Sequence, residues 1–278
     1  MGISAVALVA QVQVNLPFPF LQAGYLEKFL RRGLNPEIGL DAFSLGHYPP
    51  GAFRRAARAF QGAGRRITLH GPFQDLAPGA LDDGVLAASR RRWRQAFRYV
   101  PVFRPLAVVC HLGYEARHYR WDQERWLARS AATWKELAAL AAPYGVTVML
   151  ENVYETGPEL FLEVLGRAGA PNLQVCLDVG HLLAFGGGDF PLWLETLAPV
   201  IGQLHLHDNH GDHDAHLALG AGRVPLRETL DYLARQGRRP LITLEPHQEG
   251  SLDPSLDFLA GIWPWGLMGP TGGAHRRT

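Results

Sequence analysis

The segment QVCLDVGH, residues 174–181, joins a short apolar run to two residues with metal-ligand side chains, Asp178 and His181. A run of Val, Cys and Leu of this length is typical of a strand buried on both faces, as strands of a parallel sheet are. Five further runs have the same form: ITLHGP (67–72), AVVCH (107–111), TVMLEN (147–152), GQLHLHD (202–208) and LITLEP (241–246). His, Asp or Glu at the end of strand after strand predicts one polar site above an apolar barrel.

Strand-like and helix-like segments alternate along the whole chain. The predicted strands cover residues 3–14, 37–40, 66–69, 106–110, 146–150, 173–177, 201–206 and 241–244. Between the fourth and the fifth, we expect a long amphipathic helix that begins after Asp122 and stops near Pro143. Such alternation predicts parallel strands with crossover helices. Eight units, and the lack of a GxGxxG turn after the first strand, favour a closed (β/α)8 TIM barrel over an open dinucleotide-binding sheet.

The length of 278 residues suits one domain, because a TIM barrel typically needs about 250 residues. We expect residues 1–265 to form a single TIM-barrel catalytic domain of the α/β class. The glycine-rich and basic stretch 266–278 is expected to be a disordered tail without function. A composition of 47% apolar and 19% charged residues agrees with a compact domain that has a sizeable core.

The net charge of +1 provides no general attraction to nucleic acid or to an anionic membrane surface. No apolar run approaches the roughly 18 residues of a membrane span, and the N-terminus lacks the pattern of a secretion signal. Cys110 and Cys176 each fall inside a predicted strand, which indicates buried reduced thiols instead of a disulfide framework. We therefore expect a cytoplasmic protein without a membrane partner; a homo-oligomer is compatible with the sequence.

Only two lysines occur in the chain, Lys28 and Lys135, and neither ends a predicted strand. Barrel aldolases often need a strand-borne lysine that forms a Schiff base with a carbonyl substrate. The sequence therefore argues against covalent imine chemistry.

The last four predicted strands end in carboxylate or imidazole side chains: Glu151, Asp178, His205 and Glu245. A divalent ion needs ligands that converge from different strands at about 2.0–2.2 Å, and neighbouring strands of a barrel bring their ends together. A single strand-end Asp is more often a helix N-cap. Repetition on four consecutive strands instead predicts one divalent metal site.

Further side chains of the same types lie at or near strand ends: His70, His111, His181, Asp214 and His216. The first two end the third and fourth strands and could hold a second ion or contact substrate. The last three could form a third group. His207 has the same strand parity as His205 and is a candidate to support the ligands from behind. The alternative for the histidine-rich segment from His205 to His216 is a polar surface loop that binds metals adventitiously.

The chain resembles the xylose-isomerase-like barrel superfamily of sugar isomerases, epimerases and related metal enzymes, from about residue 3 to 262. The resemblance rests on LENVYE (150–155), CLDVGHLLAFG (176–186), HLHDNHGDHDAHLALGAG (205–222) and LITLEP (241–246). In the epimerase and isomerase members, the corresponding residues hold one divalent ion, often manganese, cobalt or magnesium. The resemblance thus implies metal binding by Glu151, Asp178, His205 and Glu245.

Abasic-site nucleases of the endonuclease-IV type share this fold and use a three-zinc cluster. Their remaining ligands match His70, His111, His181, Asp214 and His216, so the ligand types fit both activities. Three features favour a small sugar over DNA as the substrate. They are the low net charge, the sequence pattern of residues 205–222 and the lack of an insertion loop suited to opening a duplex. The complete ligand set keeps the nuclease as the alternative, and a non-catalytic metal-binding or sugar-binding barrel is a third interpretation.

We therefore expect a divalent-metal-dependent isomerase or epimerase of a sugar or sugar phosphate that works through a metal-stabilised enediolate. The metal would be Mn, Co, Mg or Zn, with one site and up to three. Glu151 and Glu245 are expected to act as base and acid on the two faces of the planar intermediate. The expected substrate-binding residues are His181, His207 and Arg223. Substrate choice is expected to depend on the loops after the first three strands and on four side chains near them: Phe18, Phe20, His47 and Phe73.

Overall fold

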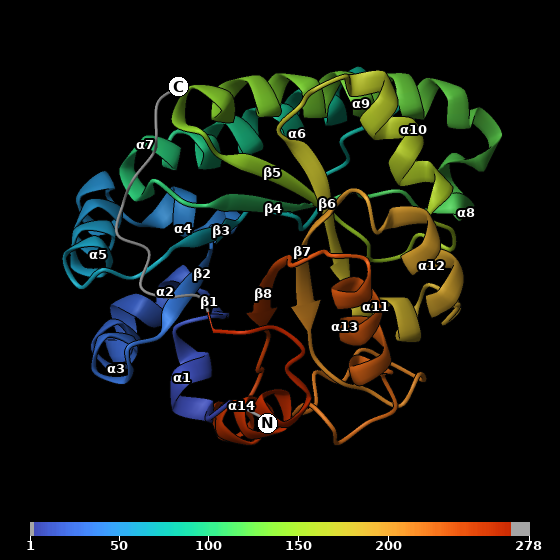
Figure 1. The fold of residues 1–278 in the computed structure, drawn as a ribbon. Helices are drawn as coiled ribbons and strands as arrows, with labels where there is room; N and C mark the ends of the chain where they lie inside the picture. The colour runs from blue at the N-terminus through green and yellow to red at the C-terminus, as the bar shows by residue number, and fades with distance from the viewer. Residues whose placement is uncertain (1–2, 268–278) are drawn as a thin grey trace, which may run out of the picture.

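The computed structural model describes residues 3–267 and contains a closed barrel of eight parallel strands that follow one another in sequence order (Figure 1). The strands are β1 Gln13–Pro17, β2 Asn35–Gly39, β3 Thr68–His70, β4 Ala107–His111, β5 Thr147–Glu151, β6 Leu173–Asp178, β7 Ile201–Leu206 and β8 Leu241–Leu244. Strand β1 pairs with both β2 and β8, which closes the sheet. The predicted TIM barrel is confirmed, and each predicted strand overlaps an observed one, the first only at its last two residues.

Helices connect the strands and cover the outside of the barrel (Figure 1). The α-helices are α1 Ala5–Val9, α2 Phe18–Phe20, α3 Leu26–Arg32, α4 Ala42–His47, α5 Pro50–Gly62, α6 Asp83–Phe97, α7 Val100–Phe103, α8 Ala116–Tyr119, α9 Gln123–Ala141, α10 Glu159–Ala168, α11 Val179–Ala184, α12 Phe190–Leu197, α13 Leu226–Arg235 and α14 Leu252–Ile262. Short π or 3-10 turns are η1 Leu21–Tyr25, η2 Arg120–Asp122, η3 Ala142–Tyr144 and η4 Glu249–Ser251. Helix α9 is the long helix that the sequence predicts.

The prediction for the first strand is wrong over its first part, because residues Ala5–Val9 form α1 and β1 begins only at Gln13. The side chain of Ser4 caps this helix by accepting a hydrogen bond from the Ala7 backbone N–H at 3.2 Å. Helix α1 contacts α14 beneath the barrel (Figure 1). An apolar run of this length fits a buried helix as well as a strand, and the N-cap decides between them.

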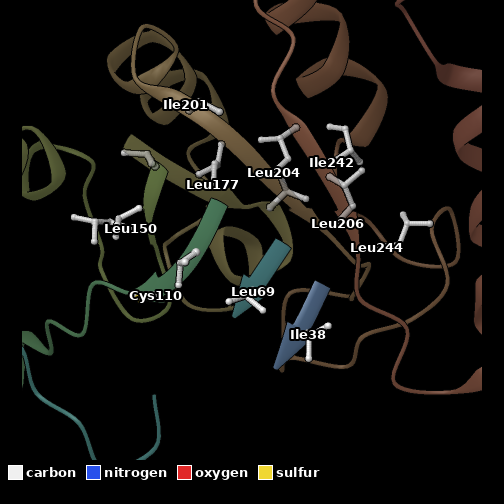
Figure 2. Packing of buried hydrophobic residues seen from close by; sticks show 14 of the residues in the cluster. Ile38, Leu69, Cys110, Leu150, Leu177, Ile201, Leu204, Leu206, Ile242 and Leu244 are labelled. Carbon is white, nitrogen blue, oxygen red and sulfur yellow. The ribbon is translucent and has the colours of Figure 1, made fainter. Parts of the chain in front are cut away.

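Successive residues along each strand point alternately outwards and inwards. The outward side chains are apolar and pack beneath the helices; Figure 2 shows Ile38, Leu69, Cys110, Leu150, Leu177, Leu204, Leu206, Ile242 and Leu244 in this role. A separate small cluster lies at the alternate positions of β4–β6 and is formed by Ala107, Val109, Met149 and Cys176. The strand-end metal-ligand side chains also point inwards. They lie at the same alternate positions, two or more residues closer to the carboxyl end of each strand. The alternation therefore directs the polar side chains into the barrel mouth.

Within residues 3–267, no helix has the length and hydrophobicity that a membrane-spanning segment requires. Both cysteines are buried and free, as predicted. Of the predicted tail 266–278, all but the first two positions lie outside the described residues.

Candidate metal centre

Four side chains from β5–β8 meet at the carboxyl end of the barrel. Glu151 and Asp178 are the last residues of β5 and β6, His205 is the penultimate residue of β7, and Glu245 directly follows β8. The ladder places Asp178 opposite His205. His205 Nδ1 lies 3.2 Å from Glu151 Oε1 and 3.1 Å from Glu245 Oε1, with Asp178 Oδ2 at 3.9 Å. One imidazole nitrogen and three carboxylates thus surround a common point.

This group has the donor set and the unmet bonding capacity of a divalent metal site. Its three buried members Glu151, Asp178 and His205 bring one ligand atom each within 4.8 Å of one another. The Oδ2 atom of Asp178 is buried and has no hydrogen-bond partner among the described residues. A buried carboxylate oxygen without a partner is costly, and a cation would satisfy it. The residues therefore fit a divalent ion such as Mn, Co, Mg or Zn.

A second group uses the other oxygen of Glu151. Its Oε2 lies 3.0 Å from His70 Nε2 and 3.5 Å from His111 Nε2. The two imidazoles come from the ends of β3 and β4, and His70 and Glu151 are buried. Glu151 is therefore placed to bridge two neighbouring ligand groups.

A third group lies on the other side of Asp178 and contains His181, His207, Asp214 and His216. Asp214 Oδ2 lies 3.4 Å from His181 Nε2 and 3.1 Å from His216 Nε2. The atoms His207 Nδ1 and Asp214 Oδ1 face each other at 3.5 Å, and neither has a hydrogen-bond partner among the described residues. All nine side chains predicted as metal ligands thus lie together in three adjoining groups.

His207, expected to bind substrate or to support the ligands from behind, lies among the ligand groups. It is 1% exposed, and its Nε2 lies 3.0 Å from Asp178 Oδ1. Gly180 allows this position, because a methyl group there would lie 2.0 Å from His207 Cε1. His207 therefore links the first group to the third.

The loop that carries Asp214 and His216 is held by Asp208, which is itself not part of the ligand groups. Its carboxylate accepts backbone N–H bonds from Gly220, Gly222 and Val224 at 2.9–3.0 Å. His216 adopts φ 45°, a left-handed backbone conformation that side chains other than glycine rarely take. Such strain is kept where the surrounding structure fixes a functional side chain.

Glu37 is the principal site residue that sequence reasoning missed. Its carboxylate is 0% exposed and lies beneath the first group, where Oε1 is 2.9 Å from His205 Nε2. Its Oε2 accepts hydrogen bonds from Gln203 Nε2, Thr68 Oγ1 and Thr243 Oγ1 at 2.6, 2.8 and 3.1 Å. A carboxylate behind a ligating imidazole fixes the tautomer, so that Nδ1 presents its lone pair to the ion. The signal in the sequence is a carboxylate that lies within a predicted strand, at the start of 37–40.

The electrostatics separate the two carboxylates predicted to be catalytic. Burial disfavours the charged form of Glu151, but the imidazoles of His205 and His111 outweigh this effect and hold its pKa well below the usual range. Burial raises the pKa of Glu245, and the charges of Glu151 and Asp178 reinforce that shift against His205. In the protein without an ion, Glu151 is thus the carboxylate and Glu245 is the group that holds a proton more readily.

The imidazoles differ in the same way. Burial opposes protonation of His181, yet the charges of Asp178 and Asp214 raise its pKa to about 10. Burial lowers the pKa of His111 to about 3. Metal ligation needs neutral imidazoles, so an ion bound to the third group displaces the proton that His181 holds.

A cavity of about 410 Å³ opens above these groups; we call it the metal lobe. Its lining includes His70, His111, Glu151, His181, Asp214, His216 and Glu245, together with Phe73, Tyr154 and Phe185. Arg223, predicted to bind substrate, is exposed and does not line this cavity. Phe73 lines the cavity as predicted, whereas Phe18 is fully buried in the core against Phe53.

Comparison with known proteins identifies relatives in sequence and in structure. The chain is 29% identical over 186 residues to the uncharacterized protein MJ1311 of Methanocaldococcus jannaschii, and the match covers 64% of each chain. A D-tagatose 3-epimerase-like protein has a TM-score of 0.78 at 22% identity, over 91% of this chain and 96% of its own. The TTHB071 protein of Thermus thermophilus, from a crystal soaked with ZnCl2, has a TM-score of 0.74 at 26% identity, over 91% and 97% of the two chains.

A sequence profile described as xylose isomerase-like TIM barrel matches residues 36–262. This range runs from β2 to the end of α14 and contains all nine predicted ligands. The chain therefore belongs to the xylose isomerase-like TIM barrel family.

Proposed function

We propose that this protein is a divalent-metal-dependent epimerase or isomerase of a small keto sugar. The observation that carries the proposal is that carboxylate oxygens of Glu151 and Glu245 lie 3.2 and 3.1 Å from the same atom, His205 Nδ1. The two glutamates come from β5 and β8, which β6 and β7 separate in the barrel. They therefore approach the same point from different directions, as two proton-transfer groups on opposite faces of a substrate must.

Glu151, Asp178, His205 and Glu245 would hold the ion, which when bound polarises a sugar carbonyl and its neighbouring hydroxyl. One glutamate accepts the proton from the carbon beside the carbonyl, which leaves a planar intermediate. The other returns a proton to the opposite face, so that the configuration at that carbon is inverted. Return to the neighbouring carbon by a single carboxylate would instead convert a ketose into an aldose.

The neighbouring side chains support this chemistry without taking part in proton transfer. Glu37 orients His205 from below, and the metal lobe is large enough for a sugar, because small-molecule cavities usually enclose about 300–1,000 Å³. The aromatic rings of Phe73, Tyr154 and Phe185 line its wall. The D-tagatose 3-epimerase-like protein of the same fold gives the substrate class by analogy. The free, buried cysteines support the expected cytoplasmic compartment.

A second candidate is a zinc-dependent phosphodiesterase acting on abasic DNA. The observation that favours it is the third group, since His181, Asp214 and His216 exceed what one ion requires. Glu151 would then bridge two ions through its two oxygens, with His70 and His111 on one side. The epimerase proposal is preferred because Glu245 and Glu151 have a proton-transfer task there.

The test uses metal-stripped protein reloaded separately with Mn, Co, Mg or Zn. Each form is incubated with a panel of ketohexoses and ketopentoses, and in parallel with a duplex that contains one abasic site. We expect an epimeric or isomeric sugar to form only with metal, and the DNA to remain intact. Cleavage of the abasic duplex by the zinc form without any sugar conversion would reject the proposal in favour of the phosphodiesterase.

A further inference from the structure

The metal lobe continues into a second cavity of about 470 Å³, which we call the outer lobe. The outer lobe lies between the β3–α6 loop, the start of α8 and the loop after β5, and residues found only there include Ala77, Glu115, Tyr119 and Glu155. The two lobes share the same five lining residues at their junction: Phe73, Gln74, His111, Val153 and Tyr154. A ligand in the metal lobe can therefore extend past His111 without leaving the protein.

The size of the two lobes exceeds the need of a single sugar ring. Each lobe alone falls within the range of about 300–1,000 Å³ that encloses a small molecule. A ketose whose reacting carbons lie above His205 fills the metal lobe only. The outer lobe then remains for a second unit that is covalently linked to the first.

The charges around the outer lobe argue for a neutral unit. Asp75, Glu115 and Glu155 supply carboxyl groups, and among the described residues no lysine or arginine lines this lobe. Arg117 lies outside the lining and pairs with Glu115 at 2.7 Å, so it offsets the charge of that carboxylate alone. A phosphate placed here would meet the carboxylate of Asp75 and no lysine or arginine in the lining, whereas sugar hydroxyls form hydrogen bonds with carboxyl groups in either protonation state.

Glu155 provides a fixed polar group in this lobe. It is 2% exposed, and its two oxygens accept the backbone N–H groups of Tyr114 and Val153 at 2.9 and 2.8 Å. These bonds hold the carboxylate in one orientation, while each oxygen keeps a further lone pair. A preorganised acceptor of this kind binds a hydroxyl with little loss of side-chain entropy.

Aromatic side chains stand at the junction of the lobes. Phe73 and Tyr154 are 43% and 53% exposed, although each is a large apolar ring beside a cavity. Phe73 is stacked on His111 with ring centroids 4.3 Å apart, and Tyr154 contacts Phe185 at 5.1 Å. Exposed rings that are held in place beside a pocket are typical of ligand contacts, and the C–H faces of sugars pack well on them.

We propose that the outer lobe is a second sugar subsite and that the substrate is a neutral glycosyl-ketose. The ketose unit occupies the metal lobe, where it reacts, and the linked sugar lies in the outer lobe between the junction aromatics and Glu155. This inference rests on the proposed function for the chemistry in the metal lobe, but the outer lobe binds its sugar whether or not conversion follows.

Isothermal titration calorimetry of the magnesium-loaded protein tests the subsite. The probes are D-fructose and three neutral glycosyl-fructoses that differ in linkage: maltulose, lactulose and isomaltulose. We expect at least one glycosyl-fructose to bind about tenfold more tightly than fructose, which is a difference of about 1.4 kcal/mol. Ala77→Tyr fills the outer lobe alone and should reduce this affinity to that of fructose, with the fructose Kd unchanged.

Two further variants secure the result. Ala132→Tyr makes the same change on the exposed outer side of α9 and should bind like the wild type. Tyr154→Ala removes an exposed ring and, if Ala77→Tyr does not fold, should still lower the ratio of glycosyl-fructose to fructose affinity severalfold. Equal affinities for all four sugars, or an unchanged ratio in both outer-lobe variants, would overturn the subsite.

Conversion of the same four sugars separates the two proposals. Turnover of fructose without any preference for the glycosyl-fructoses would leave the epimerase standing and remove the subsite. Tight binding of a glycosyl-fructose that Ala77→Tyr abolishes, without turnover of any sugar with any metal, would support the subsite and reject the epimerase.

Discussion

The two halves of the barrel contribute differently to the site. The half formed by β5–β8 ends in Glu151, Asp178, His205 and Glu245, which face one point. In the other half, β1 and β2 end in Pro17 and Gly39, and only β3 and β4 end in imidazoles. The β3–α6 loop of that half instead forms walls of both cavity lobes. Under the proposed function, one half would hold the ion and move protons, whereas the other would shape the space for the substrate.

The largest effect is expected from Glu151→Gln, which removes the carboxylate that the two halves share. Loss of a proton-transfer group typically lowers the rate by 10²–10⁴, and this change also removes a metal ligand. We expect kcat to fall by about 10³ and the bound metal to fall with it, measured by sugar conversion and by elemental analysis. The control is Glu159→Gln at the exposed start of α10. Full activity in the Glu151 variant would remove this residue from the mechanism.

The free energy of unfolding should depend on pH through Glu155, which lies at the boundary between the two halves. Burial raises the pKa of this carboxyl to about 7, against the hydrogen bonds from Val153 and Tyr114. Between about pH 4.5 and 7 the folded protein holds a proton that the unfolded chain has released, so this contribution to stability is fully present below about pH 4.5 and is lost as the pH rises through 7. The contribution is up to about 3 kcal/mol.

Urea unfolding of the metal-free protein from pH 5 to pH 8 measures this dependence. Other titrating groups affect both proteins alike, so the useful quantity is the difference in unfolding free energy between wild type and Glu155→Gln. We expect the wild type to lose stability relative to the variant as the pH rises. Parallel curves would show that Glu155 is ionised in the folded protein throughout this range.

Glu37→Gln tests how the first half supports the second, since Glu37 lies on β2 and contacts His205 on β7. Loss of a carboxylate behind a ligating imidazole typically lowers metal affinity by 10–100-fold. We expect this loss of affinity in a competition titration with a metal-binding dye, with partial recovery of kcat at high metal. A general loss of folding would instead lower kcat equally at all metal concentrations.

The smallest effect is expected from His111→Asn, because His111 reaches the first ligand group only through the second oxygen of Glu151, at 3.5 Å. If a single ion at the β5–β8 half performs the reaction, sugar conversion should fall by less than about tenfold. A loss as large as that of Glu151→Gln would mean that both halves hold essential metal ions. That outcome would favour the zinc phosphodiesterase.

The sequence predicted the β5–β8 half more completely than the other. Each ligand there follows directly on an apolar strand, so the period of two residues places it in the barrel mouth once the strand is recognised. Asp214 and His216 were harder to place, because their position depends on the turn that Asp208 holds through backbone N–H groups. No strand period predicts that turn.

The features missed from the sequence depend on contacts between distant segments. Glu37 meets His205 only because the barrel closes, and the strand parity of His207 does not distinguish burial against Asp178 from contact with substrate. Arg223, expected to bind substrate, is exposed and lies outside the lining of the metal lobe, so the cavity gives its substrate role no support. The cavity shape likewise arises from loops whose course the sequence pattern does not fix.

The central claim is that two glutamates move a proton on a keto sugar at this centre. The most direct measurement is proton NMR of a ketose incubated in D2O with the magnesium-loaded protein, its Glu151→Gln variant and its Glu245→Gln variant. The account predicts that the epimer formed by the wild type carries deuterium at the carbon beside the carbonyl, and that each single variant slows the appearance of this deuterated epimer by at least about 10². Epimer formation without solvent deuterium, or equal exchange in all three proteins, would contradict it.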